Sequence, residues 1–120
     1  MRVSKELEAR CLALAGLSGP LAVPPIAERI SEKEFMSAVI ELAKKNGWKV
    51  YHTFNSRKSE AGYPDLTLVR GNRLMFMELK REGETPDAAQ ISWLEALGET
   101  RAEVYWFQPS DWAKIVQLLA

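Results

Sequence analysis

The chain has 120 residues, enough for one globular domain with a single core, and its 47% hydrophobic and 27% charged residues are ordinary for such a domain. No apolar run approaches the roughly 20 residues of a membrane helix, and the one cysteine, Cys11, excludes both an intrachain disulfide and a cysteine-based zinc cluster. The formal net charge is zero, and we expect a cytoplasmic protein without a membrane partner.

Residues 1–30 are expected to form an N-terminal helical arm. A helix should run from Ser4, a possible N-cap, to about Leu17. The breakers Ser18-Gly19-Pro20 and Pro24-Pro25 then end it. Apolar residues recur in this helix at helical spacing, so the arm would bury that stripe either on its own domain or against a second subunit.

The domain expected at 31–120 should begin with a helix from Glu32 to about Asn46. Ser31 followed by Glu34 is a capping-box pattern at its start. The apolar stripe of this helix is centred close to Glu32, whereas Glu34 points to nearly the opposite side. A carboxylate within an apolar stripe needs a cation or a proton, so Glu32 is the better candidate for a functional site. The alternative is that Glu32 only complements the helix dipole.

The rest of the domain alternates between strand and helix patterns. Strands are expected at Trp48–Phe54, Leu66–Val69, Leu74–Leu79 and Val104–Phe107, and helices at Pro86–Leu97 and Asp111–Leu119, capped by Thr85 and Ser110. Residues 55–63 should form a loop. The order αβββαβα predicts the α/β class, with a mixed central sheet flanked by helices.

The second and third strands should form a hairpin around a two-residue turn at Gly71-Asn72. In that register Asp65 lies directly opposite Glu78, with Cβ atoms ~5 Å apart, and Lys80 shares the face of Glu78. Two opposed carboxylates suit a hard divalent cation, Mg²⁺ or Mn²⁺. Such a cation beside Lys80 fits hydrolysis of a phosphodiester. The alternative is an exposed hairpin that carries only a salt bridge.

Charge is distributed unevenly along the chain. Residues 44–81 contain nine basic and three acidic residues, whereas residues 82–111 contain seven acidic residues and one basic residue. A basic middle suits a phosphate-rich ligand such as DNA, although a solvated surface would look the same. The candidates for DNA contacts are the polar and basic residues that flank the predicted site: Asn55, Ser56, Arg57, Lys58 and Arg81.

Three motifs occur in a recognisable order, and they are Gly62-Tyr63-Pro64-Asp65, Met77-Glu78-Leu79-Lys80 and Gln90-Ile91-Ser92-Trp93-Leu94. Together they resemble the VRR-NUC family, the virus-type replication–repair nucleases of the PD-(D/E)XK superfamily. The resemblance runs from about Ser31 to Leu118 and implies a restriction-endonuclease-like core for the domain at 31–120.

The resemblance also implies roles for the matching positions. Asp65, Glu78 and the backbone carbonyl of Leu79 would bind Mg²⁺, for which Mn²⁺ could substitute, and no small-molecule cofactor is implied. The remaining positions complete the active site, and they are the catalytic lysine Lys80, Glu32 and Gln90. The implied activity is structure-selective cleavage of branched DNA, including four-way (Holliday) junctions, as in the small phage and bacterial members. Paired cuts in a twofold-symmetric junction then imply a homodimer.

Two other functions stay open at this point. One is a nuclease with a simpler target, such as a flap, a nicked duplex or an intact duplex. The other is a DNA-binding module that keeps the fold but does not turn over. The intact set of Asp65, Glu78 and Lys80 argues against the second.

Overall fold

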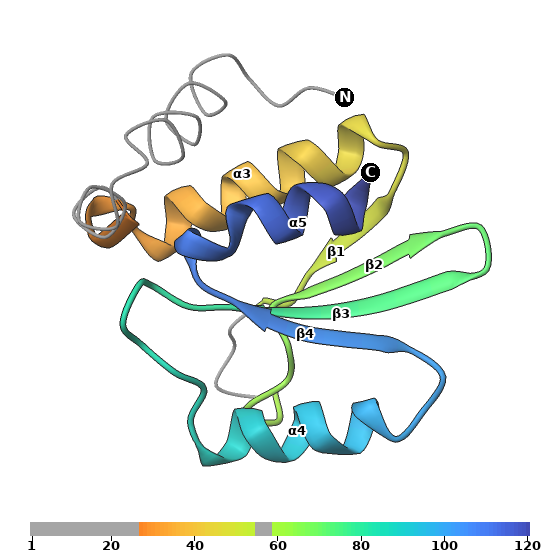
Figure 1. Ribbon diagram of the computed structural model, residues 1–120. Helices are drawn as coiled ribbons and strands as arrows, with labels where there is room; N and C mark the ends of the chain where they lie inside the picture. Colours follow the sequence, from red (N-terminus) through yellow and green to blue (C-terminus); the bar gives the residue numbers. More distant parts are fainter. Residues whose placement is uncertain (1–26, 55–58) are drawn as a thin grey trace.

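The computed structural model describes residues 27–54 and 59–120, which form a four-stranded sheet between helices (Figure 1). Most of the predicted arm, and the predicted DNA-contacting residues Asn55, Ser56, Arg57 and Lys58, lie outside the described residues. No helix in the described part of the chain is both long enough and apolar enough to cross a membrane.

Helix α3 (Glu32–Lys45) begins where the capping-box pattern predicts. The Ser31 hydroxyl accepts a hydrogen bond from the Glu34 N–H, and the Glu34 carboxylate accepts one from the Ser31 N–H, both at 3.0 Å. The reciprocal cap satisfies two N–H groups that would otherwise lack a partner in the helix. It fixes the first turn of α3, and with it the direction in which Glu32 leaves the helix.

The sheet contains β1 (Lys49–His52), β2 (Leu66–Arg70), β3 (Arg73–Leu79) and β4 (Glu103–Phe107), in the order β1-β2-β3-β4. The first two pairs are antiparallel, and β3 and β4 are parallel, so the predicted mixed sheet is confirmed. β1 is shorter than the predicted Trp48–Phe54, because its pairing with β2 ends at His52. Trp48 instead lies in the core, where its indole N–H donates to the carbonyl of Leu119 at 3.0 Å.

Helix α4 (Ala88–Gly98) starts later than the sequence pattern predicts. Its N-cap is Asp87, whose carboxylate accepts the Gln90 N–H at 2.9 Å, and not Thr85. Pro86 is buried ahead of the helix. The predicted start followed the preference of proline for the first helical position, whereas the reciprocal Asp87–Gln90 capping box sets the actual start.

The final helix also differs at its beginning. A 3₁₀ turn, η1 (Pro109–Asp111), precedes α5 (Trp112–Leu119), and Ser110 does not cap the helix. The Ser110 hydroxyl instead donates to the carboxylate of Glu82 at 2.9 Å. This contact ties the loop after β3 to the start of the C-terminal segment.

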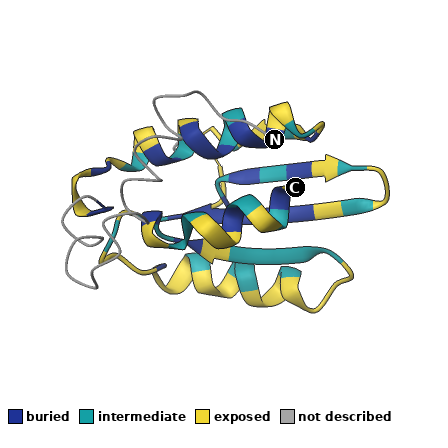
Figure 2. Ribbon diagram, turned by 45° about the horizontal axis from the view of Figure 1, so that its top comes forward, coloured by how far each residue is buried: buried dark blue, intermediate teal, exposed yellow. Residues whose placement is uncertain are grey.

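The helices lie on opposite faces of the sheet. α3 and α5 lie side by side on one face, and α4 lies on the other (Figure 1). The hydrophobic core lies between the sheet and the pair α3 and α5. It contains large apolar side chains from these two helices and from β2, β3 and β4, among them Phe35, Leu42, Leu68, Met75, Met77, Phe107 and Ile115. α4 has no fully buried residue, as Figure 2 shows. The face of the sheet that α4 covers carries the side chain of Glu78, which contacts Gln90 of α4.

Two residues that precede the expected domain start belong to the core. Ala27 is fully buried and Ile30 is 9% exposed, and both pack in the main hydrophobic cluster. The expected division at Ser31 stays a prediction, but the packed unit includes residues from Ala27 onward.

Candidate active site

Asp65 and Glu78 face each other across the β2–β3 hairpin. Leu66 pairs with Met77, so Asp65, directly before β2, lies opposite Glu78. The backbone holds Asp65 from two sides, because the Leu79 N–H donates to its Oδ2 and the Thr53 N–H donates to its carbonyl oxygen, both at 2.8 Å. Glu78 is 1% exposed and is the one charged residue that is fully buried in the described part of the chain.

Lys80 follows the end of β3 and turns back toward the same carboxylates. Its Nζ lies 3.9 Å from Oε2 of Glu78, and its side chain is 16% exposed. The Lys80 N–H donates to the carbonyl of Phe107 at 3.0 Å, which extends the pairing with β4 by one residue. A half-buried ammonium group therefore shares one small volume with two carboxyl groups.

Gln90 reaches this volume from the first turn of α4. Its Nε2 donates to Oε2 of Glu78 at 2.7 Å, and its Oε1 accepts the Asp87 N–H at 2.9 Å. The glutamine thus contacts the buried carboxylate directly, across a sequence separation of twelve residues.

Gly62 allows the loop before Asp65 to lie closely against α4. It has a φ of +94°, and a Cβ atom there would lie 2.5 Å from the backbone C and O of Ala89. Tyr63 follows and packs edge-on against Phe76 and Trp93, with ring centroids 6.0 and 5.0 Å apart. The loop before Asp65 is therefore fitted to the helix that carries Gln90.

Glu32 and Glu34 take different positions at the start of α3. Glu34 is exposed and forms the capping box. Glu32 is partly buried, and its pKa is raised by burial and then by the nearby charge of Asp65, while Lys80 opposes the shift. Glu32 therefore lies within electrostatic reach of the hairpin carboxylates.

Burial and mutual repulsion alter the protonation of the paired carboxyls. Burial, followed by the charge of Asp65, raises the pKa of Glu78 to about 8. Burial also raises the pKa of Asp65, although the Leu79 N–H and Lys80 oppose it. Near pH 7 the pair therefore retains a proton unless a cation offsets its charge.

The oxygen atoms of this pair fit a hard cation. Oε1 of Glu78 is buried and has no hydrogen-bond partner among the described residues. A buried carboxylate oxygen without a donor is costly, and a cation would remove that cost. Within residues 27–54 and 59–120 no three His, Cys, Asp or Glu side chains are grouped closely enough to bind an ion. The candidate ligand side chains that the described residues bring together are therefore two, Asp65 and Glu78.

Two further groups lie around the site. Arg81 is exposed, and its charge acts on Glu32. His52 is exposed at the end of β1, and its charge acts on Asp65.

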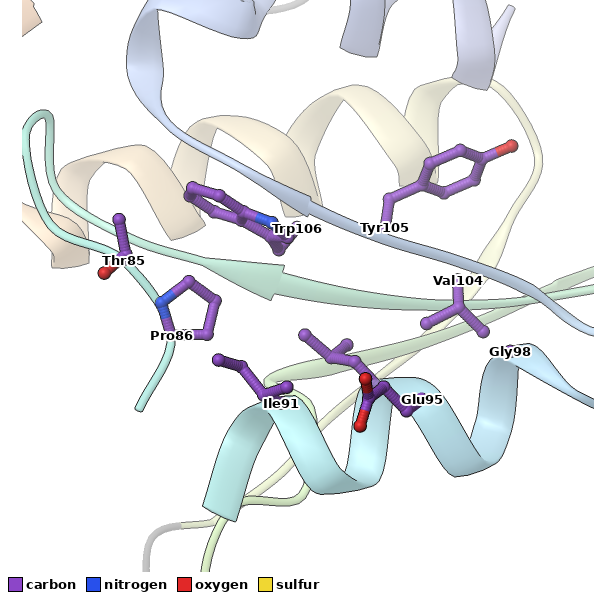
Figure 3. Close-up of a pocket in the computed structure, with 9 residues that line it drawn as sticks. Thr85, Pro86, Ile91, Glu95, Gly98, Val104, Tyr105 and Trp106 are labelled. Atoms are coloured by element: carbon purple, nitrogen blue, oxygen red, sulfur yellow. The ribbon is translucent and has the colours of Figure 1, made fainter. Parts of the chain in front are cut away.

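A separate apolar pocket of about 390 Å³ lies between α4 and β4 (Figure 3). Its lining is mainly apolar and includes Pro86, Ile91, Leu94, Val104 and Trp106. It contains none of the carboxylates of the hairpin. Trp106 is nevertheless the strand partner of Glu78 and is 40% exposed, so the pocket is one strand away from the site.

The sequence interpretation did not single out Asp87 as a contributor. Its signal was present as an Asp with a Gln three residues later, which is a capping-box pattern. The contact between Gln90 and Glu78 had no such local signal, because it depends on how α4 packs on the sheet.

Comparison with known proteins supports the fold. One solved structure, described as a VRR_NUC domain, matches with a TM-score of 0.62 at 22% sequence identity, over 73% of this chain and 92% of that chain. No protein-family model and no curated protein matches the sequence. The chain therefore has a VRR-NUC-like, restriction-endonuclease-like α/β fold.

Proposed function

We propose that this protein is a metal-dependent endonuclease that hydrolyses phosphodiester bonds in DNA. The observation that carries the proposal is the Asp65–Glu78 pair, in which Oε1 of the buried Glu78 lacks a donor and Lys80 Nζ lies 3.9 Å from Oε2. The likeness in fold to a VRR_NUC domain supports it. A cation would replace the proton that the isolated pair retains near pH 7 and would offset the charge of both carboxylates.

The cation would be Mg²⁺, with Mn²⁺ as a substitute, held by Asp65, Glu78 and the carbonyl of Leu79. When bound, it would polarise a phosphoryl oxygen and lower the pKa of a water molecule. Lys80 would orient the attacking water or neutralise charge that develops on the phosphate, since its ammonium group lies beside Glu78. Glu32 would act through its charge or through a water molecule, because it lies within electrostatic reach of Asp65.

The DNA we propose is branched, with the four-way junction as the favoured substrate. Such a junction has twofold symmetry, and paired cuts need two centres. The described residues supply one candidate centre per chain, so a homodimer with an isologous interface would supply both. Arg81, exposed beside Glu32, is a candidate phosphate contact.

A cleavage assay on a panel of end-labelled DNAs tests this proposal. The panel contains a four-way junction, a flap, a nicked duplex, an intact duplex and a single strand, each with Mg²⁺ and with Ca²⁺. We expect paired cuts in the junction with Mg²⁺, and binding with little turnover in Ca²⁺. Light scattering should show a dimer on the junction.

The other outcomes separate the remaining functions. If a monomer cleaves the flap or the nicked duplex in preference to the junction, that DNA becomes the proposed substrate. Binding without cleavage of any DNA would identify a non-catalytic DNA-binding module and overturn the proposal.

A further inference from the structure

The two ends of the Gln90 side-chain amide are held by different partners. Oε1 accepts the backbone N–H of Asp87, and Nε2 donates to Oε2 of Glu78. In the same turn, Oδ1 of Asp87 accepts the backbone N–H of Gln90. The side chain therefore belongs both to a helix cap and to the candidate site.

The cap determines which way round the amide lies. If the amide were flipped, its oxygen would face a carboxylate oxygen at 2.7 Å and its NH₂ group would face the Asp87 N–H. The contact of two N–H donors would be repulsive at any pH, and the contact of two oxygens would be repulsive once Glu78 is ionised. The capping box thus presents the NH₂ group to Glu78, and only Oε2 of that carboxylate receives it.

We infer that Asp87 is a positioning residue, whose capping box with Gln90 directs the Gln90 NH₂ group to Oε2 of Glu78 and leaves Oε1 as the oxygen that faces a bound cation. The inference rests on the proposed function, because it concerns the same metal site. Two observations carry it: the occupied Oε2 and the buried, unpartnered Oε1 of one carboxylate. Asp87 itself is exposed and acts only through Gln90.

The position of the first turn of α4 makes this contact possible. No residue of α4 is fully buried, so the turn is placed by specific contacts rather than by deep packing. The close approach of Gly62 to Ala89 and the capping box together fix the position of the Gln90 backbone, from which its side chain reaches Glu78. Loss of the cap should therefore loosen the contact with Glu78 before it unfolds the domain.

Three variants of the full chain separate positioning from stability. Asp87→Ala keeps the backbone N–H that donates to Oε1 of Gln90 but removes the carboxylate that accepts the Gln90 N–H, so the first turn of α4 loses its cap and Gln90 its fixed place. Asp87→Asn keeps an acceptor oxygen. Ala96→Gly, at an exposed position in the same helix, lowers helix stability by a similar amount, ~1 kcal/mol, without touching the cap. The readouts are the NMR signals of the Gln90 side-chain NH₂ group and the Mn²⁺ affinity by calorimetry.

We expect Asp87→Ala to shift the Gln90 NH₂ signals toward those of a free amide and to weaken Mn²⁺ binding about tenfold, as for other loss of outer-sphere support. Asp87→Asn and Ala96→Gly should stay within about twofold of the wild type. Wild-type NH₂ signals and Mn²⁺ affinity in Asp87→Ala would overturn the inference. Equal weakening by Ala96→Gly would also overturn it, because helix stability alone would then explain the effect.

The NMR readout does not require a metal. If the wild-type protein binds no Mn²⁺, the proposed function fails, yet the NH₂ signals still report whether Asp87 orients Gln90. A shift in Asp87→Ala would then support the positioning contact alone. The two failures are therefore distinguishable.

Discussion

At the scale of single residues, the buried carboxyl of Glu78 is destabilising unless its charge is offset. The group is 1% exposed, faces Asp65 and has a pKa raised to about 8. In the unfolded chain the same carboxyl would titrate near its ordinary value of 4.5. Between these two values the unfolded state loses its proton while the native state retains it, so stability falls as pH rises.

The first prediction follows from that sign. Without divalent cations, Glu78→Gln should be more stable than the wild type at pH 8, and the advantage should shrink as pH falls toward 4.5. Urea unfolding in EDTA at several pH values measures it, with the exposed Glu95→Gln as control. A variant less stable than the wild type at pH 8 would show that the native fold does not penalise the charge.

The second prediction concerns Lys80. Lys80→Ala should lower DNA cleavage at least about a hundredfold, the scale of a lost catalytic proton-transfer group or electrostatic contact. Mn²⁺ affinity should stay close to normal, because lysine supplies no ligand oxygen. Calorimetry at pH 9, where proton competition at Glu78 is weak, compares the two proteins. Loss of Mn²⁺ binding together with cleavage would assign Lys80 a structural role.

At the scale of elements, the first turn of α3 separates two carboxylates that are neighbours in sequence. Glu34 completes the cap, and Glu32 lies near the hairpin. Glu32→Gln should lower cleavage at least about tenfold, whereas Glu34→Gln should stay within about twofold of the wild type, because glutamine also completes a capping box. Steady-state cleavage rates of the two variants and the wild type on the same DNA test this prediction. The reverse order would mean that Glu34, and not Glu32, serves the site.

The elements also show what the sequence can predict and where prediction stops. The hairpin register follows from a two-residue turn and strict alternation, so Asp65 and Glu78 could be paired from local rules. The start of α3 follows from a local cap. The predicted start of α4 was wrong because two local signals competed: the preference of proline for the first helical position and the Asp87–Gln90 capping box. The contacts of Gln90 with Glu78 and of Ser110 with Glu82 depend on tertiary packing, which no local pattern encodes.

At the scale of the whole molecule, the core extends past the expected domain boundary. Ala27 and Ile30 are buried against it. A chain that begins at Ser31 should therefore be less stable than one that begins at Ala27 by several kcal/mol, on the order of lost core side chains. Urea unfolding of the two shortened proteins measures this difference. Equal stability of the two shortened chains would show that residues 27–30 do not contribute to the core.

The chain that begins at Ala27 also tests assembly. The apolar stripe predicted in the arm would pack either on the domain or on a second subunit. Light scattering of the chain that begins at Ala27, alone and on four-way junction DNA, tests whether the arm is needed for the dimer contact. A dimer of that shortened chain would place the dimer contact outside residues 1–26.

The central claim is that Asp65 and Glu78 hold a cation that supports cleavage of DNA. The most direct measurement is the cleavage of end-labelled four-way junction DNA by the wild type and by Asp65→Asn, each purified identically and assayed with Mg²⁺ and with EDTA. We predict cleavage by the wild type in Mg²⁺, none in EDTA, and a loss of at least about a hundredfold in Asp65→Asn. Cleavage undiminished by EDTA, or equal cleavage by the two proteins, would contradict the claim.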